Sequence, residues 1–377
     1  MLPTVTGGTE TYARGLISGL ATTPSEYEFV LFLNEESSDW DAGEGNRFER
    51  QVVPLKATSR FRRLLFEQTR LPYEIKRRRI RLLHSLGYVG PAIAPCATVV
   101  TIPDANAWSE WHRLGLARFV VARTLTRWSA QRAGAVLTLS GFGRQEVIRW
   151  IGVPPGRVEV TYPGSDLRPA LVGPPLATSG GGVRRPYFIA FSSPHPHKNL
   201  DRLVEAFRIA RMERGVRHEL EVLGNRPPWA KGSAGNTEGV RFAGYVSESE
   251  KEQMFDGAEA LIFPSLYEGL GFPLLEAMAR GVPVLCSDRA SLPEIGGDAP
   301  VYFDALSVPA IAEAIVRFTQ DPSVKNGMIE RGFRQAARFS WKTTAEKTLA
   351  VYQRVLRKDA RVKTEGEEQR RVIRTSR

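Results

Sequence analysis

The sequence predicts an α/β protein made of two parallel-sheet domains in tandem. Short apolar runs of strand length alternate with segments of helical periodicity, which is the pattern of a doubly wound parallel sheet. This alternation stops at residues 165–186, a stretch rich in Pro and Gly with three successive glycines, and it restarts at Tyr187. Because the chain has 377 residues, two domains of ordinary size fit on either side of this linker.

The N-terminal part begins with a glycine-rich helix start. Gly7 and Gly8 precede a helix that we expect from about Thr9 to Leu20. Glycines at a helix start let a phosphate or another ligand approach the backbone closely. The strands that we expect next are EFVLFLN, QVVPL, RLLHS, ATVVTIPD, AVLTLS and VEVTYPG, with amphipathic helices at 124–131 and 142–150 among them.

A basic region at Arg60–Arg81 contributes strongly to the net charge of +11. It holds nine basic residues against two acidic ones, Glu67 and Glu74. Such a patch attracts nucleic acid, anionic lipid head groups or a phosphorylated acceptor. No nucleic-acid-binding motif accompanies it, so we favour a membrane surface or a lipid-pyrophosphate acceptor; a solvated basic helix face is an equally good explanation.

The second half repeats the alternation of strands and helices. The sequence predicts strands at YFIAFSS, HELEVLG, 240–245 and VYFD, helices at 200–211 and 308–318, and a short helix capped by Ser291. An amphipathic helix follows at 339–357, with Trp341 near its start. Residues 358–377 are highly charged and lack an apolar face, so we expect them to be disordered.

The most informative stretch is Leu261–Ser287, which predicts a strand, a turn, a helix and a second strand. LIFP and VPVLCS are short apolar runs typical of buried parallel strands. Gly269 and Gly271 interrupt the periodicity, and Pro273 fits the first position of a helix, where its missing N–H costs nothing. In such a unit the turn lies at the carboxyl end of the strand, where open α/β sheets bind ligands.

Two glutamates flank this turn and indicate its ligand. Glu268 lies just before the turn, and Glu276 lies in the first turns of the helix. The N–H groups and the dipole at the helix start favour a phosphate. An acidic side chain beside a phosphate is unfavourable unless it binds hydroxyl groups, so a sugar is the natural ligand for both glutamates. The alternative is that Glu276 only complements the helix dipole and that Glu268 is solvated.

The composition argues against several other classes of protein. Hydrophobic content of 42% and charged content of 25% are ordinary for a globular domain. The two cysteines, Cys96 and Cys286, form no CxxC pair, which argues against a disulfide scaffold or a zinc site and fits a reducing compartment. No apolar run approaches the roughly 18 residues of a membrane span. We therefore expect a cytoplasmic protein without a metal or another cofactor.

The string EGLGFPLLEAMARGVPV at 268–284 resembles the signature of the retaining glycosyltransferase family 4. The segment HPHKNLDRLVEAF resembles the phosphate-lysine loop of the same family, and the chain as a whole resembles bacterial mannosyltransferases. The resemblance implies the GT-B fold, in which two Rossmann-like doubly wound domains face a cleft and the C-terminal helix crosses back to the N-terminal domain. The expected parts are an acceptor-side domain at 1–164, the linker at 165–186, a nucleotide-sugar-binding domain at 187–338, the crossing helix at 339–357 and the tail at 358–377.

The same resemblance implies the activity and its residues. A retaining, metal-independent enzyme would move a sugar from a nucleotide-sugar donor, with a mild preference for GDP-mannose, to a hydroxyl of a glycan or lipid-linked acceptor in surface polysaccharide or glycolipid synthesis. Glu276 would bind the ribose hydroxyls and Glu268 those of the donor sugar. The candidate catalytic residues are Glu268, Lys198 and Asp104. The candidate donor-binding residues are Gly7, Gly8, Lys198, Tyr245, Val246, Glu268, Gly269, Leu270, Gly271, Phe272, Leu274, Leu275 and Glu276.

Three departures from the family keep a second function open. The chain begins six residues before Gly7, too few for the buried strand that precedes this loop in the family, so either translation starts upstream or the sheet lacks that strand. Pro103 replaces a histidine that family members often carry before Asp104, and proline cannot shuttle a proton. The arginine that often precedes the loop lysine is absent, or is replaced by His195 or His197. An inactive or weak nucleotide-sugar-binding scaffold is therefore the alternative, ahead of a nucleotide-sugar epimerase.

Overall fold

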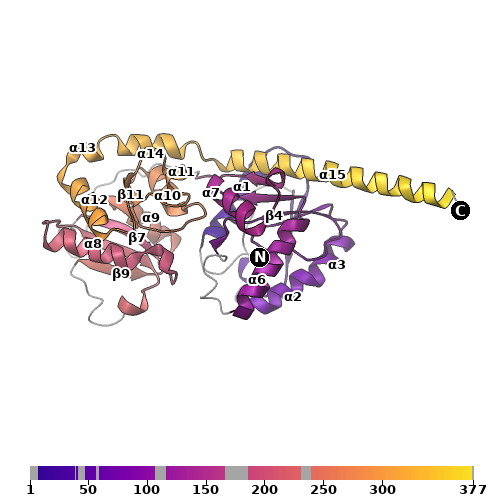
Figure 1. Cartoon of the computed structure of the whole chain (residues 1–377), viewed down its shortest axis with the longest axis horizontal. Coiled ribbons are helices and arrows are strands. Elements are labelled where there is room, and N and C mark those ends of the chain that lie inside the picture. Colours follow the sequence, from indigo (N-terminus) through magenta and orange to yellow (C-terminus); the bar gives the residue numbers. More distant parts are fainter. Residues whose placement is uncertain are drawn as a thin grey trace. The chain divides into compact units, whose positions relative to one another are not determined.

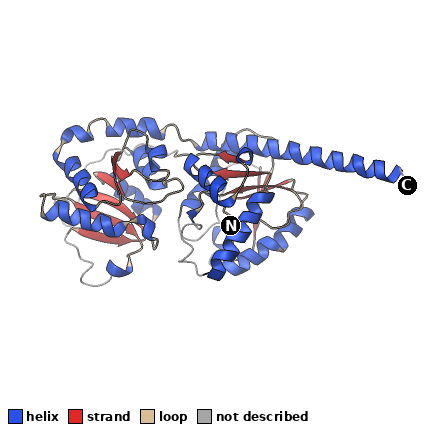
Figure 2. Ribbon diagram, in the orientation of Figure 1, coloured by secondary structure: helices blue, strands red, loops and turns tan. Residues whose placement is uncertain are grey.

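The computed structural model describes residues 7–38, 40, 47–56, 59–106, 116–165, 186–230 and 239–375. The chain divides into two compact units (Figure 1). The N-terminal unit comprises Met1–Gly164 and Ser340–Arg377, and the C-terminal unit comprises Ser165–Phe339. Each unit combines parallel strands with covering helices (Figure 2). All strand pairs of the described residues are parallel, which confirms the predicted α/β class.

The C-terminal unit contains one continuous six-stranded sheet of order β12–β11–β10–β7–β8–β9. The first strand of the unit, β7, lies inside the sheet, which grows to β9 on one side and to β12 on the other. The order therefore reverses between β7 and β10, and open α/β sheets bind ligands at this kind of switch point. The strands are β7 Tyr187–Ser192, β8 Glu219–Gly224, β9 Val240–Gly244, β10 Ala260–Phe263, β11 Val284–Ser287 and β12 Val301–Phe303.

The core of this unit is dense because its central strands are buried on both faces. All residues of β10 and β11 are buried, as their continuous apolar sequences predict. On one face Phe207 packs edge-on against Phe188, with ring centroids 6.4 Å apart. Burying a side chain of this size stabilises the fold by about 1.5–3 kcal/mol. The helices of this unit are α8 Leu200–Met212, α9 Glu248–Asp256, α10 Phe272–Arg280, α11 Leu292–Gly296, α12 Val308–Gln320, α13 Pro322–Lys325 and α14 Met328–Ala336.

The N-terminal unit contains two separate sheets, one of order β1–β2 and one of order β3–β4–β5–β6. The strands are β1 Phe29–Leu33, β2 Phe48–Val52, β3 Leu82–Ser85, β4 Ala97–Thr101, β5 Ala135–Thr138 and β6 Val158–Val160. The helices are α1 Gly8–Thr22, α2 Arg60–Gln68, α3 Arg70–Arg77, α6 Leu116–Arg132 and α7 Gly141–Glu146. Residues 1–6, where the family's first strand was expected to lack room, lie outside the described residues, as do residues 166–185 of the expected linker.

One predicted strand of this unit is displaced. The expected strand QVVPL is observed as Phe48–Val52, which begins three residues earlier than Gln51. The register pairs Phe29 with Phe48, and their rings stack at 5.0 Å. Pro54 explains why pairing stops before the predicted end, since proline cannot donate a ladder hydrogen bond.

The last helix, α15 Trp341–Thr375, belongs to the N-terminal unit, as the fold prediction requires. It begins on α1, where Trp341 lies 6.2 Å from Tyr12 between ring centroids. Only glycine fits at this crossing, because a Cβ added at Gly15 would lie 2.0 Å from the Trp341 ring. Thr344 Oγ1 donates a hydrogen bond of 2.5 Å to the Tyr162 carbonyl and fixes the first turn.

The expectation of disorder from Lys358 onward is wrong as far as Thr375, because the backbone of α15 stays helical to that residue. Lys, Arg, Glu and Gln dominate this tail, and all four are good helix formers. The packed first turns of α15 supply the nucleus that an isolated charged helix would lack. An apolar face is therefore not needed to continue the helix.

Candidate functional site

The predicted strand–turn–helix unit is observed at the switch point of the C-terminal sheet. β10 ends at Phe263, and α10 begins at Phe272 with Gly271 as its N-cap. Gly271 has φ = 95°, a left-handed conformation that favours glycine, and a Cβ there would lie 2.7 Å from Leu292 Cδ2. Glycine is therefore required for backbone conformation and for packing at this turn.

Leu274 and Leu275, two of the candidate donor-binding residues, lie in the first turn of α10. Their N–H groups donate to the Gly271 carbonyl, at 3.0 and 3.3 Å. Their part in donor binding stays a prediction. Their side chains are fully buried, so these two leucines shape the turn from the core side.

Lys198 and Glu268, predicted from separate motifs, lie together in the structure. Lys198 Nζ lies 2.6 Å from Glu268 Oε1, and both side chains are mostly buried, with 18% and 13% exposed. The lysine also lies over the Phe263 ring, 5.4 Å from its centroid. This pairing answers the electrostatic objection to a glutamate beside a phosphate, because the ammonium group neutralises the carboxylate.

Asn199 fixes the loop that carries Lys198. The loop follows β7 as a short 3₁₀ turn at Pro196–Lys198, and Asn199 adopts φ = 56°. Its buried amide nitrogen donates to the carbonyls of Pro264 and Ala305, at 3.1 and 2.7 Å. The amide therefore anchors the lysine loop to the end of β10.

Ser291 braces the glycine turn from the other side. Its hydroxyl lies 2.9 Å from the carbonyl oxygens of both Glu268 and Leu270. The prediction that Ser291 caps α11 is wrong, because the helix receives no cap hydrogen bond from this side chain. The hydroxyl is used to hold the turn, a contact across more than twenty residues that no local sequence pattern reveals.

Glu276 is paired with a lysine that sequence reasoning missed. Lys251 Nζ on α9 lies 3.2 Å from Glu276 Oε2 and 2.6 Å from Glu248 Oε1. Burial raises the pKa of Glu276, and Lys251 offsets part of this rise. Burial lowers the pKa of Lys251, but the two carboxylates more than compensate, so its pKa is raised. Lys251 therefore keeps a positive charge beside Glu276.

The other predicted residues of the C-terminal unit form the surroundings of these pairs. Gly244 ends β9 with φ = 75°, and Tyr245 and Val246 lead from it to α9. The Tyr245 side chain is 64% exposed, so it is available to a ligand. Ser247 then starts α9 with a reciprocal capping box to Glu250, as its predicted place at a helix start implies.

Gly7, Gly8 and Asp104 belong to the N-terminal unit. Gly7 is the N-cap of α1 and Gly8 its first residue, so the predicted glycine-rich helix start is observed. Asp104 follows β4 and accepts hydrogen bonds from the Tyr88 hydroxyl at 3.1 Å and from the Asn106 N–H at 3.0 Å. These contacts give Asp104 a role in the local turn, whereas a role in proton transfer stays a prediction.

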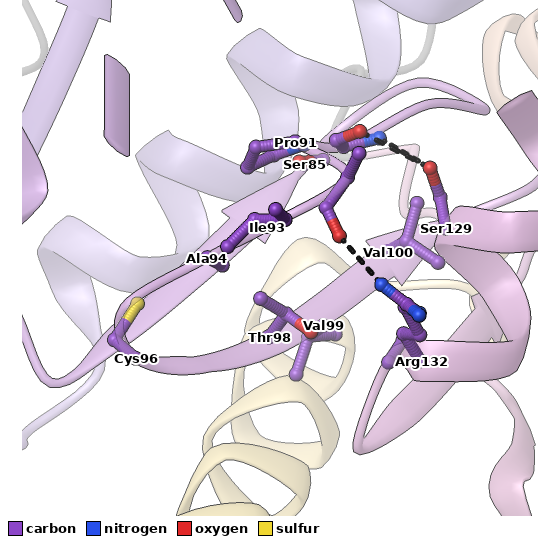
Figure 3. Close-up of a pocket in the computed structure, with 13 residues that line it drawn as sticks. Ser85, Pro91, Ile93, Ala94, Cys96, Thr98, Val99, Val100, Ser129 and Arg132 are labelled. Carbon is purple, nitrogen blue, oxygen red and sulfur yellow. Dashed lines mark hydrogen bonds between the residues drawn. The ribbon is translucent and has the colours of Figure 1, made fainter. Parts of the chain in front are cut away.

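A small cavity of about 220 Å³ lies in this unit, and two polar side chains that line it, Ser129 and Arg132, bond to the backbone (Figure 3). Ser129 Oγ donates to the Gly90 carbonyl at 3.1 Å, and Arg132 donates to the Ala92 carbonyl at 3.2 Å. Both contacts tie the loop after β3 to α6. The cavity is therefore a packing feature of this loop.

Two family models match the chain, one in each half. The model described as Glycosyltransferase Family 4 matches residues 6–168, and the model described as Glycosyl transferases group 1 matches residues 181–335. The Glycosyltransferase Family 4 match contains the Gly7–Gly8 helix start. The group 1 match contains both lysine–glutamate pairs and the glycine turn.

Curated relatives and solved structures agree with this assignment. The O-antigen chain mannosyltransferase B of Escherichia coli is 34% identical over 240 residues, which cover 59% of this chain and 61% of that protein. The MMP alpha-(1->4)-mannosyltransferase of Mycolicibacterium hassiacum is 28% identical over 234 residues, which cover 60% of this chain and 56% of that protein. The matches thus span less than two thirds of these relatives.

The sucrose-phosphate synthase of Thermosynechococcus elongatus shares the fold, with a TM-score of 0.71 at 18% identity over 93% of this chain and 94% of that structure. Together the paired family models, the fold and the glycine turn lead to one assignment: the chain belongs to the group 1 and family 4 glycosyltransferases of the GT-B fold.

Proposed function

We propose that the chain is a retaining, metal-independent hexosyltransferase that takes its sugar from a nucleotide-sugar donor, with GDP-mannose preferred. The observation that carries this proposal is the Lys198–Glu268 pair at 2.6 Å, beside the glycine turn at the sheet's switch point. A cation and a carboxylate in contact suit a ligand that has a diphosphate next to a sugar. The preference for mannose rests on the printed names of the two curated relatives, both of which are mannosyltransferases.

Lys198 would stabilise the leaving nucleoside diphosphate. Negative charge develops on the diphosphate as the bond to the sugar breaks, and a preorganised cation in a partly buried site lowers the energy of that charge. Lys198 is held for this task by Asn199, whose amide is bonded to two carbonyls. No movement of the loop is then required during the reaction.

Glu268 and Glu276 would bind hydroxyl groups of the donor. Ser291 bonds to the Glu268 carbonyl and fixes the backbone of this residue. The Glu268 carboxylate would therefore be well positioned to accept hydrogen bonds from the sugar. Lys251 keeps a positive charge beside Glu276 and supports its ionised form, which accepts hydrogen bonds from ribose hydroxyls better than a neutral acid does. The two glutamates would then orient opposite ends of the donor.

Retention of the anomeric configuration would not require a side chain that acts as a base. We infer that the departing phosphate itself takes the acceptor proton on the face from which it leaves. Pro103 has no group that could carry this proton, and Asp104 already accepts two hydrogen bonds. The scheme therefore does not need the histidine that the chain lacks.

The acceptor is proposed to be a glycan or a lipid-linked sugar in surface polysaccharide or glycolipid synthesis. Helices α2 and α3 carry exposed cations together with two exposed apolar side chains, Leu65 at 53% and Tyr73 at 62%. Cations interleaved with exposed apolar groups suit the surface of an anionic membrane. No helix of the described residues is long and apolar enough to cross a bilayer.

Thermal-shift measurements with a panel of nucleotide sugars test this proposal first, because a bound donor stabilises the folded state. We expect GDP-mannose to raise Tm more than UDP-hexoses do, and Glu276→Ala to reduce the shift. Glu205→Ala is the matched control, since Glu205 is an exposed glutamate of the same unit. Release of the nucleotide from the stabilising donor would then support an enzyme. A donor that binds but stays intact with every acceptor supplied would favour the scaffold alternative.

A further inference from the structure

A loop of the N-terminal unit carries the most exposed large apolar side chain of the described residues. The loop follows β3 and contains Gly90–Pro95, of sequence GPAIAP, which we call the apolar loop. Ile93 lies at its tip and is 75% exposed. No charged residue occurs between Ser85 and Pro103. A single exposed isoleucine is ordinary by itself, so the argument depends on how the loop is held.

Side chains of two helices hold the apolar loop. Gln68 of α2 donates to the Gly90 carbonyl at 3.2 Å and accepts from the Ala92 N–H at 2.7 Å. Ser129 of α6 accepts from the Gly90 N–H at 3.1 Å. Arg132 of α6 donates to the Ala92 carbonyl at 3.2 Å (Figure 3). The loop is therefore ordered before any partner arrives, which lowers the entropic cost of binding.

The same hydrogen bonds prepare the apolar loop for an environment without water. A backbone N–H that enters an apolar phase without a partner is strongly unfavourable. Pro91 and Pro95 have no N–H, and the N–H groups of Gly90 and Ala92 are bonded to side chains. Four of the six residues thus have no N–H group that depends on water for a partner. A protein partner could supply such hydrogen bonds itself, whereas lipid cannot, so this arrangement favours lipid.

Exposed apolar side chains of α2 and α6 extend the surface around the tip. Arg132, which bonds to the apolar loop, also lies over the Trp128 ring, 4.4 Å from its centroid, and this ring is partly exposed. On the other side, the exposed Leu65 lies one helical turn before Gln68. Ile93 is therefore flanked by an aromatic and an aliphatic side chain.

The charge of α6 indicates the kind of surface that fits. The helix sequence at Leu116–Arg132 contains four arginines and no acidic residue. Arg123, Arg127 and Arg132 are exposed. Tryptophan is enriched at the interface between membrane and water, where arginine can reach lipid phosphates while its stem covers apolar surface. Charge complementarity therefore selects a bilayer that contains anionic lipids.

We propose that the apolar loop is a shallow membrane anchor. Ile93 and Trp128 insert into the interface of an anionic bilayer, and the arginines of α6 contact the phosphates of the head groups. Gln68 and Arg132 keep the loop in its inserted conformation. The anchor adds an apolar contact to the electrostatic attraction of the basic helices, and it does not depend on the proposed transfer reaction.

Co-sedimentation of the full chain with lipid vesicles tests the anchor. The vesicles contain phosphatidylcholine alone or mixed with phosphatidylglycerol. We expect Ile93→Ser to weaken binding to the mixed vesicles by at least about fivefold, because the inserted apolar group is lost. Ile329→Ser is the matched control, since Ile329 is an exposed isoleucine of the other unit, and it should bind like the unaltered chain. Equal Tm values will show that both variants are folded.

Tryptophan fluorescence provides a second measurement. Ile93→Trp keeps an apolar tip and adds a reporter, so brominated lipids should quench its emission more than that of Ile329→Trp. Equal quenching, or equal vesicle binding by Ile93→Ser and the unaltered chain, would overturn the anchor. If Ile93→Ser instead abolished self-association in sedimentation velocity without changing vesicle binding, the partner would be a second copy and the membrane would be rejected. No donor is present, so these outcomes do not depend on donor binding.

Discussion

The two units contain strands of similar composition but bury them to different degrees. In the C-terminal unit the six strands form one sheet, and β10 and β11 are completely buried. In the N-terminal unit the strands fall into two sheets, and the equally apolar β1 is mostly half-buried. Apolar sequence therefore predicts a strand, whereas its burial depends on a neighbour that occupies the next position in the sheet.

The same contrast separates the candidate residues of the two units. Around β10, side chains from distant segments hold Lys198 and Glu268 in place through Asn199 and Ser291. In the N-terminal unit, Gly7 and Gly8 begin helix α1, whose Leu16 and Leu20 are buried. The candidate residues of the C-terminal unit are thus held by side-chain hydrogen bonds, whereas Gly7 and Gly8 are placed by the backbone of a helix start.

The largest expected effect compares core positions of the two units. Leu285→Ala in β11 should lower the free energy of unfolding by about 3 kcal/mol, because Leu285 is fully buried and a cavity remains. Leu31→Ala in half-buried β1 should cost about 1 kcal/mol. Urea unfolding, monitored by hydrogen exchange in each unit, measures both losses in the free energy of unfolding. Equal losses would contradict the contrast in packing.

The second prediction concerns the cation at the proposed donor site. Lys198→Ala should lower kcat by roughly 30- to 100-fold, equivalent to about 2–3 kcal/mol, because a charge-assisted contact with the leaving phosphate is lost. The donor KM should change much less. Steady-state kinetics with saturating acceptor measure both constants, with Lys342→Ala, an exposed lysine of the other unit, as control. Unaltered kcat would remove Lys198 from the mechanism.

The third prediction uses His84, a half-buried histidine of β3. His84 lies 2.6 Å from the Tyr352 hydroxyl through Nδ1 and 2.8 Å from Thr101 Oγ1 through Nε2. Burial lowers its pKa to about 3. The folded state disfavours the protonated form of His84. Its contribution to the free energy of unfolding is therefore complete above pH 6.5 and is lost as the pH falls toward 3.

At pH 5 this loss should be about 2 kcal/mol, at roughly 1.4 kcal/mol per pH unit. His84→Gln retains a hydrogen-bonding side chain but does not titrate, so its stability should fall less steeply between pH 7 and pH 5. Urea midpoints across this range measure the difference. If the urea midpoints of the two proteins fell equally with pH, folding would not lower the pKa of His84.

The smallest expected effect concerns Glu276. Glu276→Ala should raise the donor KM about tenfold and leave kcat nearly unchanged, because hydrogen bonds to the ribose act equally in the ground and transition states. Lys251→Met should raise the same KM by a smaller factor, since it removes only the partner of the carboxylate. A fall in kcat without a change in KM would place Glu276 at the reacting bond instead.

The sequence was sufficient for the fold class and the centre of the site, because both depend on local patterns. Alternating apolar runs predicted parallel strands, and the string around Gly271 predicted the turn and its helix. Ser291 and Lys251 were missed as partners because their contacts with the glutamates span more than twenty residues. The helical tail was missed because the prediction weighed its lack of an apolar face above its helix propensity.

The ion pair between Lys198 and Glu268 has a consequence for selectivity. The carboxylate is an internal counter-ion of the ammonium group, so a free phosphate must displace it. In the proposed donor complex, a nucleotide sugar would replace this contact and would also give Glu268 new hydroxyl partners, which phosphate alone cannot do. Competition by inorganic phosphate should therefore be weak in the unaltered protein and stronger in Glu268→Gln. Equal inhibition constants would show that the pair does not discriminate between the two anions.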